Sequence, residues 1–137
     1  MRQPAAWLLG AVAVLAGACA PAAASGAPRP ATVVVTAHWS HWDVGHLRFR
    51  AGQRVTFVVR NTDPIDHEFI VGDRATQNRH EAGTDAHHDG SVPGEVSVPA
   101  ESQVTTTVTF DRRGSFEFAC HIPGHYAYGM HGEIAVS

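Results

Sequence analysis

The chain has no lysine. All ten basic residues among its 137 are arginines, and 13 acidic residues set the formal net charge at −3. The arginines are spread along the chain and form no basic stripe that could follow a nucleic-acid backbone. We therefore expect no nucleic-acid partner.

A long apolar run is also missing. The longest one, from Ala5 to Leu15, is rich in alanine and too short for a membrane-spanning helix. It follows Arg2 and precedes small residues, a pattern typical of an N-terminal targeting segment. We expect residues 1–24 to be a signal segment that places the folded domain outside the cytoplasmic membrane, in the periplasm or at the cell surface.

The targeting segment contains two alternative cleavage sites. Ala16-Gly-Ala-Cys19 resembles a bacterial lipobox, and cleavage there would leave Cys19 as a lipidated N-terminus. Ala22-Ala-Ala24 fits the Ala-x-Ala rule of ordinary signal peptidase, and cleavage there would leave Ser25 first. We favour the lipid anchor at Cys19, because a cysteine at the end of such a run otherwise has no explanation.

The remainder is long enough for one domain. Residues 20–30 are rich in Ala, Pro and Gly, which predicts a flexible tether, and residues 31–137 are expected to form the folded part. With Cys19 lipidated or removed, Cys120 is the only cysteine of this domain. A lone thiol in an oxidising compartment has no disulfide partner, and a coordinated metal would hold it as a thiolate. Iron–sulfur clusters need more cysteines than this chain has.

Short segments with apolar residues at alternate positions recur between turn signals, and no stretch has a convincing helical period. The expected strands cover residues 32–36, 47–50, 54–60, 67–71, 95–98, 104–110, 115–119 and 134–136. About eight short strands at this spacing predict an all-β fold, an antiparallel sandwich. The polar stretch 72–93 is the exception, and we expect a long connection there with room for a short helical turn.

The most informative stretch is Phe116-Glu-Phe-Ala-Cys-His-Ile-Pro-Gly-His-Tyr-Ala-Tyr-Gly-Met130. It places a thiol, an imidazole and a thioether in the order Cys-x4-His-x4-Met. One thiolate and two imidazoles with a weak axial methionine form the ligand field of a blue-copper electron-transfer site. The second imidazole must come from elsewhere, and Asp66-His-Glu-Phe-Ile70 offers it. Zinc fits less well, because it prefers four firm ligands.

Local patterns place the thiol inside the fold. Phe116 and Phe118 occupy alternate positions, which predicts a half-buried strand with Cys120 at its inward-facing end. Pro123-Gly124 then predicts a tight turn directly before His125. The cysteine and the histidine are therefore expected to approach the same point from two sides of a turn.

These motifs resemble the copper-binding loop of the cupredoxins, the family of plastocyanin, azurin and rusticyanin. The likeness extends over residues 31–137 and is closest to single-domain bacterial members with Cys-His-x-Pro-Gly-His-x4-Met near the C-terminus. It implies a Greek-key β-sandwich that holds one type 1 copper ion cycling between Cu(I) and Cu(II). Carried over residue by residue, the resemblance implies that the ligands are His67, Cys120, His125 and Met130.

Three further expectations accompany this resemblance. The residue after the first histidine ligand is often a small polar one that braces the cysteine loop, but Glu68 stands here, so Asn61 or Thr62 would have to substitute. The exposed edge of His125 would be the electron port, and redox partner proteins of the cytochrome or oxidase type would dock on a small apolar patch around it. The protein would act as a monomer.

Ten histidines exceed what one copper ion needs. Six of them form two groups: His38, His41 and His46, and His80, His87 and His88. Each group is open to two interpretations, either solvated side chains or a second metal site, and for the second group the nearby Asp85 and Asp89 could contribute.

The sequence thus predicts a one-electron carrier that is not an enzyme. The alternative is a copper storage or delivery protein of the cell envelope, which the surplus histidines favour. A module of an oxidase or nitrite reductase is disfavoured, because the chain has one domain and no His-x-His pairs.

Overall fold

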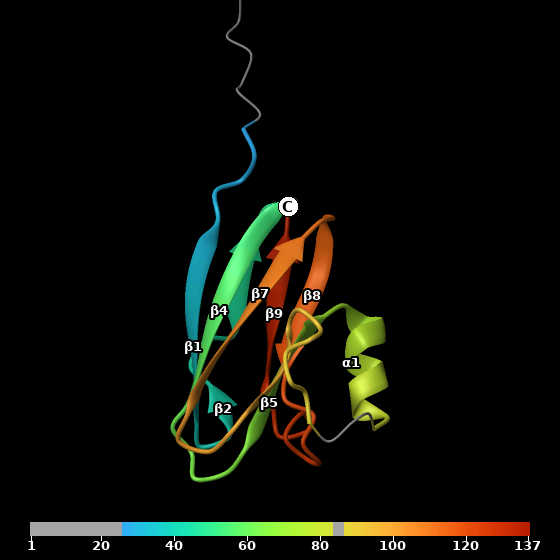
Figure 1. Cartoon of the computed structure of the whole chain (residues 1–137). Coiled ribbons are helices and arrows are strands. Elements are labelled where there is room, and N and C mark those ends of the chain that lie inside the picture. The colour runs from blue at the N-terminus through green and yellow to red at the C-terminus, as the bar shows by residue number, and fades with distance from the viewer. Residues whose placement is uncertain (1–25, 84–86) are drawn as a thin grey trace, which may run out of the picture.

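The computed structural model describes residues 26–83 and 87–137 (Figure 1). The predicted signal segment, Cys19 with both cleavage sites, the first part of the tether and Asp85 lie outside these residues. Within the described part, no helix is long and apolar enough to cross a membrane.

Two sheets pack face to face (Figure 1). One has the strand order β2-β1-β4-β7, formed by β1 (Ala31–His38), β2 (His41–Trp42), β4 (Gln53–Asn61) and β7 (Gln103–Phe110). The other has the order β3-β9-β8-β5-β6, formed by β3 (His46–Phe49), β5 (His67–Gly72), β6 (Glu95–Val98), β8 (Gly114–Ala119) and β9 (His131–Val136).

This architecture confirms the predicted all-β sandwich. Every expected strand is present, and the short strand β2 is added to them. Most neighbours are antiparallel, but each sheet also contains one parallel pair, β1 with β4 and β3 with β9. Both sheets are therefore mixed. In each parallel pair, the chain passes through the other sheet before it returns beside the earlier strand.

The core lies between the sheets and is built from the alternating residues of their strands. Val55, Phe57 and Val59 of β4 are fully buried, and Phe69 of β5 and Phe118 of β8 meet them from the opposite sheet. The ring centroids of Phe57 and Phe69 are 5.3 Å apart, and those of Phe69 and Phe118 are 5.6 Å apart. These aromatic contacts hold β5 and β8 rigidly, and the predicted metal ligands lie at the ends of these strands.

One helix, α1 (Arg74–Glu81), occupies part of the connection for which only a short helical turn was expected. Asp73 caps its first turn by accepting a hydrogen bond from the Thr76 N–H. The residues that α1 buries are polar, Gln77 and His80. Hydrophobic periodicity could not reveal such a helix, because its buried face carries no apolar stripe.

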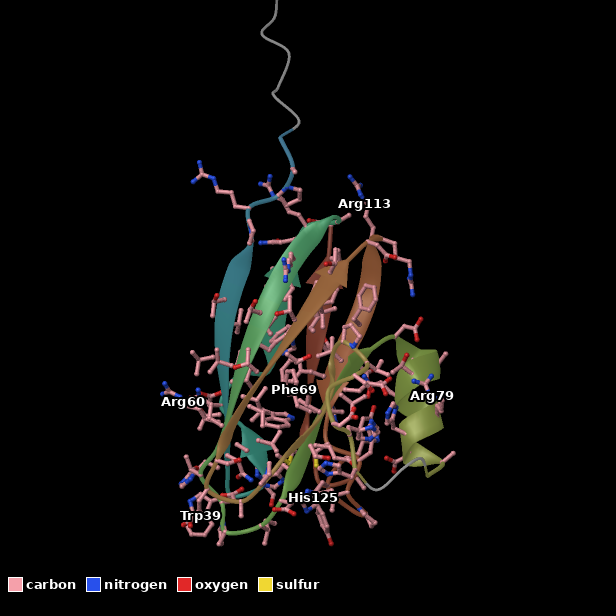
Figure 2. The ribbon with its side chains drawn as sticks, in the orientation of Figure 1. Trp39, Arg60, Phe69, Arg79, Arg113 and His125 are labelled. Atoms are coloured by element: carbon pink, nitrogen blue, oxygen red, sulfur yellow. The ribbon has the colours of Figure 1, made fainter. Side chains whose placement is uncertain are left out.

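The loop that follows β8 lies at the end of the sandwich opposite the C-terminus (Figure 1). Figure 2 shows His125 of this loop and Trp39 of the β1–β2 turn at that same end. Phe69 is labelled farther from this end, near the middle of the sandwich, and its side chain belongs to the core. The metal-ligand candidates thus cap one end of a packed core.

Gly132→Ala tests the packing of β9 against β8. A Cβ atom at position 132 would overlap the ring of Phe118, which is fully buried and has no room to move. We expect the free energy of unfolding of the metal-free protein to fall by about 1–3 kcal/mol, measured by chemical denaturation. Gly45→Ala is the control, since a Cβ there meets no atom within 4 Å. Equal stability of the two variants would contradict this packing.

Candidate metal centre

Three donor atoms from remote parts of the chain meet at one point. Sγ of Cys120 is 3.3 Å from Nδ1 of His125 and 3.9 Å from Nδ1 of His67, and the two Nδ1 atoms are 3.3 Å apart. Ligands about 2.0–2.3 Å from a single ion in a plane are separated by roughly 3.5–4 Å. The triangle therefore has about the size that one metal ion requires.

Met130 lies beside this triangle. It is fully buried and packs with Cys120 and Ala37. Its backbone N–H donates to the carbonyl of His125, and its own carbonyl accepts from the Cys120 N–H, each at 3.0 Å. The three donors of the loop are thus linked by main-chain hydrogen bonds.

The orientation of His67 is set by a buried carboxylate, Asp63. Nε2 of His67 is 2.8 Å from Oδ2 of Asp63, and both side chains are almost fully buried. A carboxylate only accepts hydrogen bonds, so Nε2 carries a proton, and the other ring nitrogen, Nδ1, is the one that faces Cys120 and His125. Such a hydrogen bond on the far side of the ring is typical of metal-binding histidines.

Asp63 is itself held by the β1–β2 turn. Its carboxylate accepts hydrogen bonds from the N–H groups of Trp39 and Ser40 at 2.7 and 2.8 Å. Burial alone would raise the pKa of Asp63, but the hydrogen bonds from Ser40, His67 and Trp39 outweigh it and hold that pKa below the usual range. Asp63 is therefore ionised, and its negative charge lies beside the Nε2–H group of His67.

The sulfur of Cys120 accepts a hydrogen bond from the Glu68 backbone N–H at 3.3 Å. Asn61 and Thr62, expected from the resemblance to brace the cysteine loop, do not play this part. The Asn61 side-chain amide instead donates to the carbonyls of Ile65 and Val98, which fixes the loop before His67. The main chain supplies the donor, so the identity of the side chain at position 68 does not matter for it.

Burial controls the protonation of the donors when no metal is bound. It raises the pKa of the Cys120 thiol to about 11, despite the opposing hydrogen bond from the Glu68 N–H. Burial, together with the nearby His67, lowers the pKa of His125. Near neutral pH the metal-free centre therefore holds a neutral thiol and a neutral His125 imidazole.

The rim of the centre is open at His125. This side chain is half-buried, whereas His67, Cys120 and Met130 are fully buried. Tyr128 beside it is 79% exposed. Tyr126 has a packing role, since its hydroxyl donates to Glu117 and its ring stacks on two neighbouring histidine rings.

Residues 8–136 match the model of the cupredoxin-like domain. The chain belongs to this family. Sequence relatives include the copper-resistant cuproprotein CopI of Rubrivivax gelatinosus, 37% identical over 107 residues that cover 75% of this chain and 64% of the relative. The CopI protein of Pseudomonas aeruginosa is 28% identical over 123 residues, 66% of this chain and 67% of the relative. The chain thus spans about two thirds of the length of these cuproproteins.

Solved structures of auracyanins have a similar fold. Auracyanin B matches with a TM-score of 0.63 at 19% identity, covering 78% of this chain and 88% of that protein. Auracyanin A, a "blue" copper protein from Chloroflexus aurantiacus, matches with a TM-score of 0.61 at 22% identity, covering 79% and 99%. These matches confirm the cupredoxin fold, and the family together with the donor set confirms copper as the cofactor.

The histidines of the first surplus group do not converge. Nδ1 of His38 lies 2.9 Å from the Thr62 hydroxyl, that of His41 lies 2.7 Å from the Trp39 carbonyl, and that of His46 lies 3.4 Å from the Glu133 carboxylate. Among residues 26–83 and 87–137, the groups of donors close enough to share an ion contain none of these three. The second surplus group differs, because its His80 and His88 do converge, together with Glu95.

Copper binding should release a proton. With a thiol pKa of about 11, Cys120 is protonated at pH 7 and must ionise to bind metal, whereas His125 has already lost its proton. Anaerobic calorimetric titration with Cu⁺ in buffers of different ionisation enthalpy should show about one proton released per ion. Cys120→Ala is the control and should lack this release. A wild-type protein that binds Cu⁺ without proton release would show that the thiol is already ionised.

Proposed function

We propose that the protein is a type 1 copper protein that carries single electrons outside the cytoplasmic membrane, with His67, Cys120, His125 and Met130 as copper ligands. The observation that supports it most is the triangle of one sulfur and two imidazole nitrogens at separations of 3.3 to 3.9 Å. Bound copper supplies a one-electron couple between Cu(II) and Cu(I).

Rigid positions of the donors suit this role. His67 and Cys120 lie at the start of β5 and just after β8, neighbouring strands of one sheet with a packed aromatic core behind them. The Asp63 carboxylate and the Glu68 N–H fix the imidazole and the sulfur without any metal. A site held in this way needs little rearrangement when its charge changes by one unit.

Electron exchange is best served by His125, since it is the one proposed ligand that reaches the surface. Pro123, Ala127 and Tyr128, which flank it in the same loop, are exposed and uncharged and offer a small docking patch. We propose that redox partner proteins dock there and that the protein acts as a monomer without catalytic activity. Location in the cell envelope, with a lipid anchor at Cys19, remains part of the same proposal and depends on the N-terminal sequence.

A role in copper handling is the second candidate. The sequence relatives carry the name copper-resistant cuproprotein, which associates proteins of similar sequence with tolerance of the metal. The chain also has more histidines than one copper site uses. Storage or delivery would use the same buried centre but would require that copper leaves it for an acceptor.

An absorption spectrum of the Cu(II) form tests the ligand assignment. We expect an intense visible thiolate-to-copper charge-transfer band in the wild type and its complete loss in Cys120→Ala. In Met130→Leu the band should persist with a raised reduction potential, because the weak thioether helps to stabilise Cu(II). His46→Ala, which removes an exposed histidine, should leave band and potential unchanged. A colourless wild type that takes up zinc only would refute the assignment.

Copper transfer separates the carrier from the handling protein. A carrier should cycle reversibly in voltammetry and keep its copper when mixed with the apoprotein of an envelope copper protein. A handling protein should pass the metal on, and elemental analysis of the two proteins after separation would show it. Retention of all copper in the presence of the acceptor apoprotein would contradict delivery.

A further inference from the structure

A second group of donors lies between helix α1 and β6. His80 of α1, His88 of the following connection and Glu95 of β6 each place one donor atom within 4.8 Å of the others. The side chains are 1%, 10% and 13% exposed, respectively. Histidine and glutamate are rarely buried to this extent unless they are paired or bind a metal, so this group needs a physical explanation.

His80 presents a lone pair or a positive charge to Glu95. Its Nδ1 lies 2.9 Å from the carbonyl of Thr76, and a carbonyl only accepts, so Nδ1 carries a proton. The other nitrogen, Nε2, lies 3.3 Å from Oε2 of Glu95. If the imidazole is neutral, the lone pair of Nε2 points at the lone pairs of the carboxylate, and the two repel each other unless a cation lies between them.

His88 has an unsatisfied nitrogen. Its Nε2 is buried and has no hydrogen-bond partner among residues 26–83 and 87–137, where Oε1 of Glu68, at 3.6 Å, is too distant to serve as one. The residue is not loosely placed, because its backbone exchanges two hydrogen bonds of 2.9 Å with Ser97 of β6. A buried polar nitrogen without a partner costs free energy, and a bound ion would satisfy it.

Glu95 is oriented for such an ion. Its Oε1 accepts from the guanidinium of Arg79 at 2.9 Å, which leaves Oε2 facing His80. A surface cavity of about 460 Å³ is lined by His80, His88 and Glu95 among others, and it gives an ion and its water ligands access to the group. Figure 2 labels Arg79 on α1, the helix that also carries His80.

We propose that His80, His88 and Glu95 form a second metal site, for a divalent cation of the Zn²⁺ and Cu²⁺ class. Imidazole nitrogen suits these ions, whereas Ca²⁺ and Mg²⁺ prefer oxygen ligands throughout. The site has no sulfur donor, so it lacks the soft ligands that select Cu(I). Three protein ligands leave coordination positions for water from the cavity. This site is distinct from the electron-transfer centre and goes beyond the proposed function.

The neighbouring His121 is not one of its ligands. The two ring nitrogens lie 2.8 Å from the Glu81 carboxylate and 2.7 Å from the Gln77 side-chain oxygen, so both are occupied. Its ring nevertheless stacks on that of His80, with centroids 5.8 Å apart. His121 follows Cys120 in the chain. A residue next to a proposed ligand of the first centre therefore contacts His80, a ligand of the second.

Calorimetric titration of the full chain with Zn²⁺ tests the proposal, in a Cys120→Ala background that disables the first centre. We expect one Zn²⁺ ion per chain. Adding His88→Ala or Glu95→Gln should weaken this binding by at least about tenfold. Losing a partner that only supports a metal ligand already costs about that much, and these two residues are ligands themselves. Adding His46→Ala, which removes an exposed histidine from another face, should leave it unchanged. The same series with Cu²⁺, followed by electron paramagnetic resonance, should show coupling to two imidazole nitrogens, which falls to coupling to one in His88→Ala.

Two outcomes would overturn the second site. One is the absence of Zn²⁺ and Cu²⁺ binding in the Cys120→Ala background, which would make the group an ion pair of His80 and Glu95 only. The other is binding that survives both His88→Ala and Glu95→Gln. Glu95→Gln preserves the shape of the side chain, and circular dichroism of each variant confirms its fold. The result does not depend on whether the first centre transfers electrons.

Discussion

The metal end of this domain depends on one buried carboxylate. Asp63 accepts hydrogen bonds from the two residues of the β1–β2 turn, Trp39 and Ser40, and from the ring of His67. Its own N–H donates to the Asn61 side chain at the end of β4. One anion therefore joins both sheets at the point where the first imidazole must be fixed. Trp39 and Ser40 both have positive φ angles, a conformation that few residues other than glycine adopt, and the carboxylate compensates for it.

The fold was predictable because its strands alternate so regularly. Val55, Phe57 and Val59 occupy every second position of β4, and each is fully buried. The candidate donors of the C-terminal loop stand out in the sequence for another reason. The chain has only 2 cysteines and 2 methionines, so a Cys-x4-His-x4-Met spacing at the end of a strand pattern is specific. The second imidazole had to come from a remote part of the chain, and His67 was proposed for it because the strand that begins there resembles the one that carries the first histidine ligand in cupredoxins.

The parts that escaped prediction depend on polar contacts without sequence periodicity. Helix α1 buries Gln77 and His80 instead of an apolar stripe, and β2 has only two residues. Glu95 could not be assigned to a donor group from sequence, because its partner His80 is brought close only by the docking of α1. The hydrogen bond that holds Cys120 comes from a backbone N–H, which every residue but proline possesses, so no side-chain pattern could predict it.

The position of Trp42 gives the centre a built-in optical reporter. Its indole N–H donates to the Met130 carbonyl at 3.2 Å, and its ring centroid lies 6.4 Å from that of His67. Trp39, by contrast, is 77% exposed. The two indoles therefore emit from different surroundings, one partly shielded among aromatic rings and one in water. A paramagnetic ion beside His67 would quench the blue-shifted component first, so the fluorescence of this protein would reveal occupancy and oxidation state without any added dye.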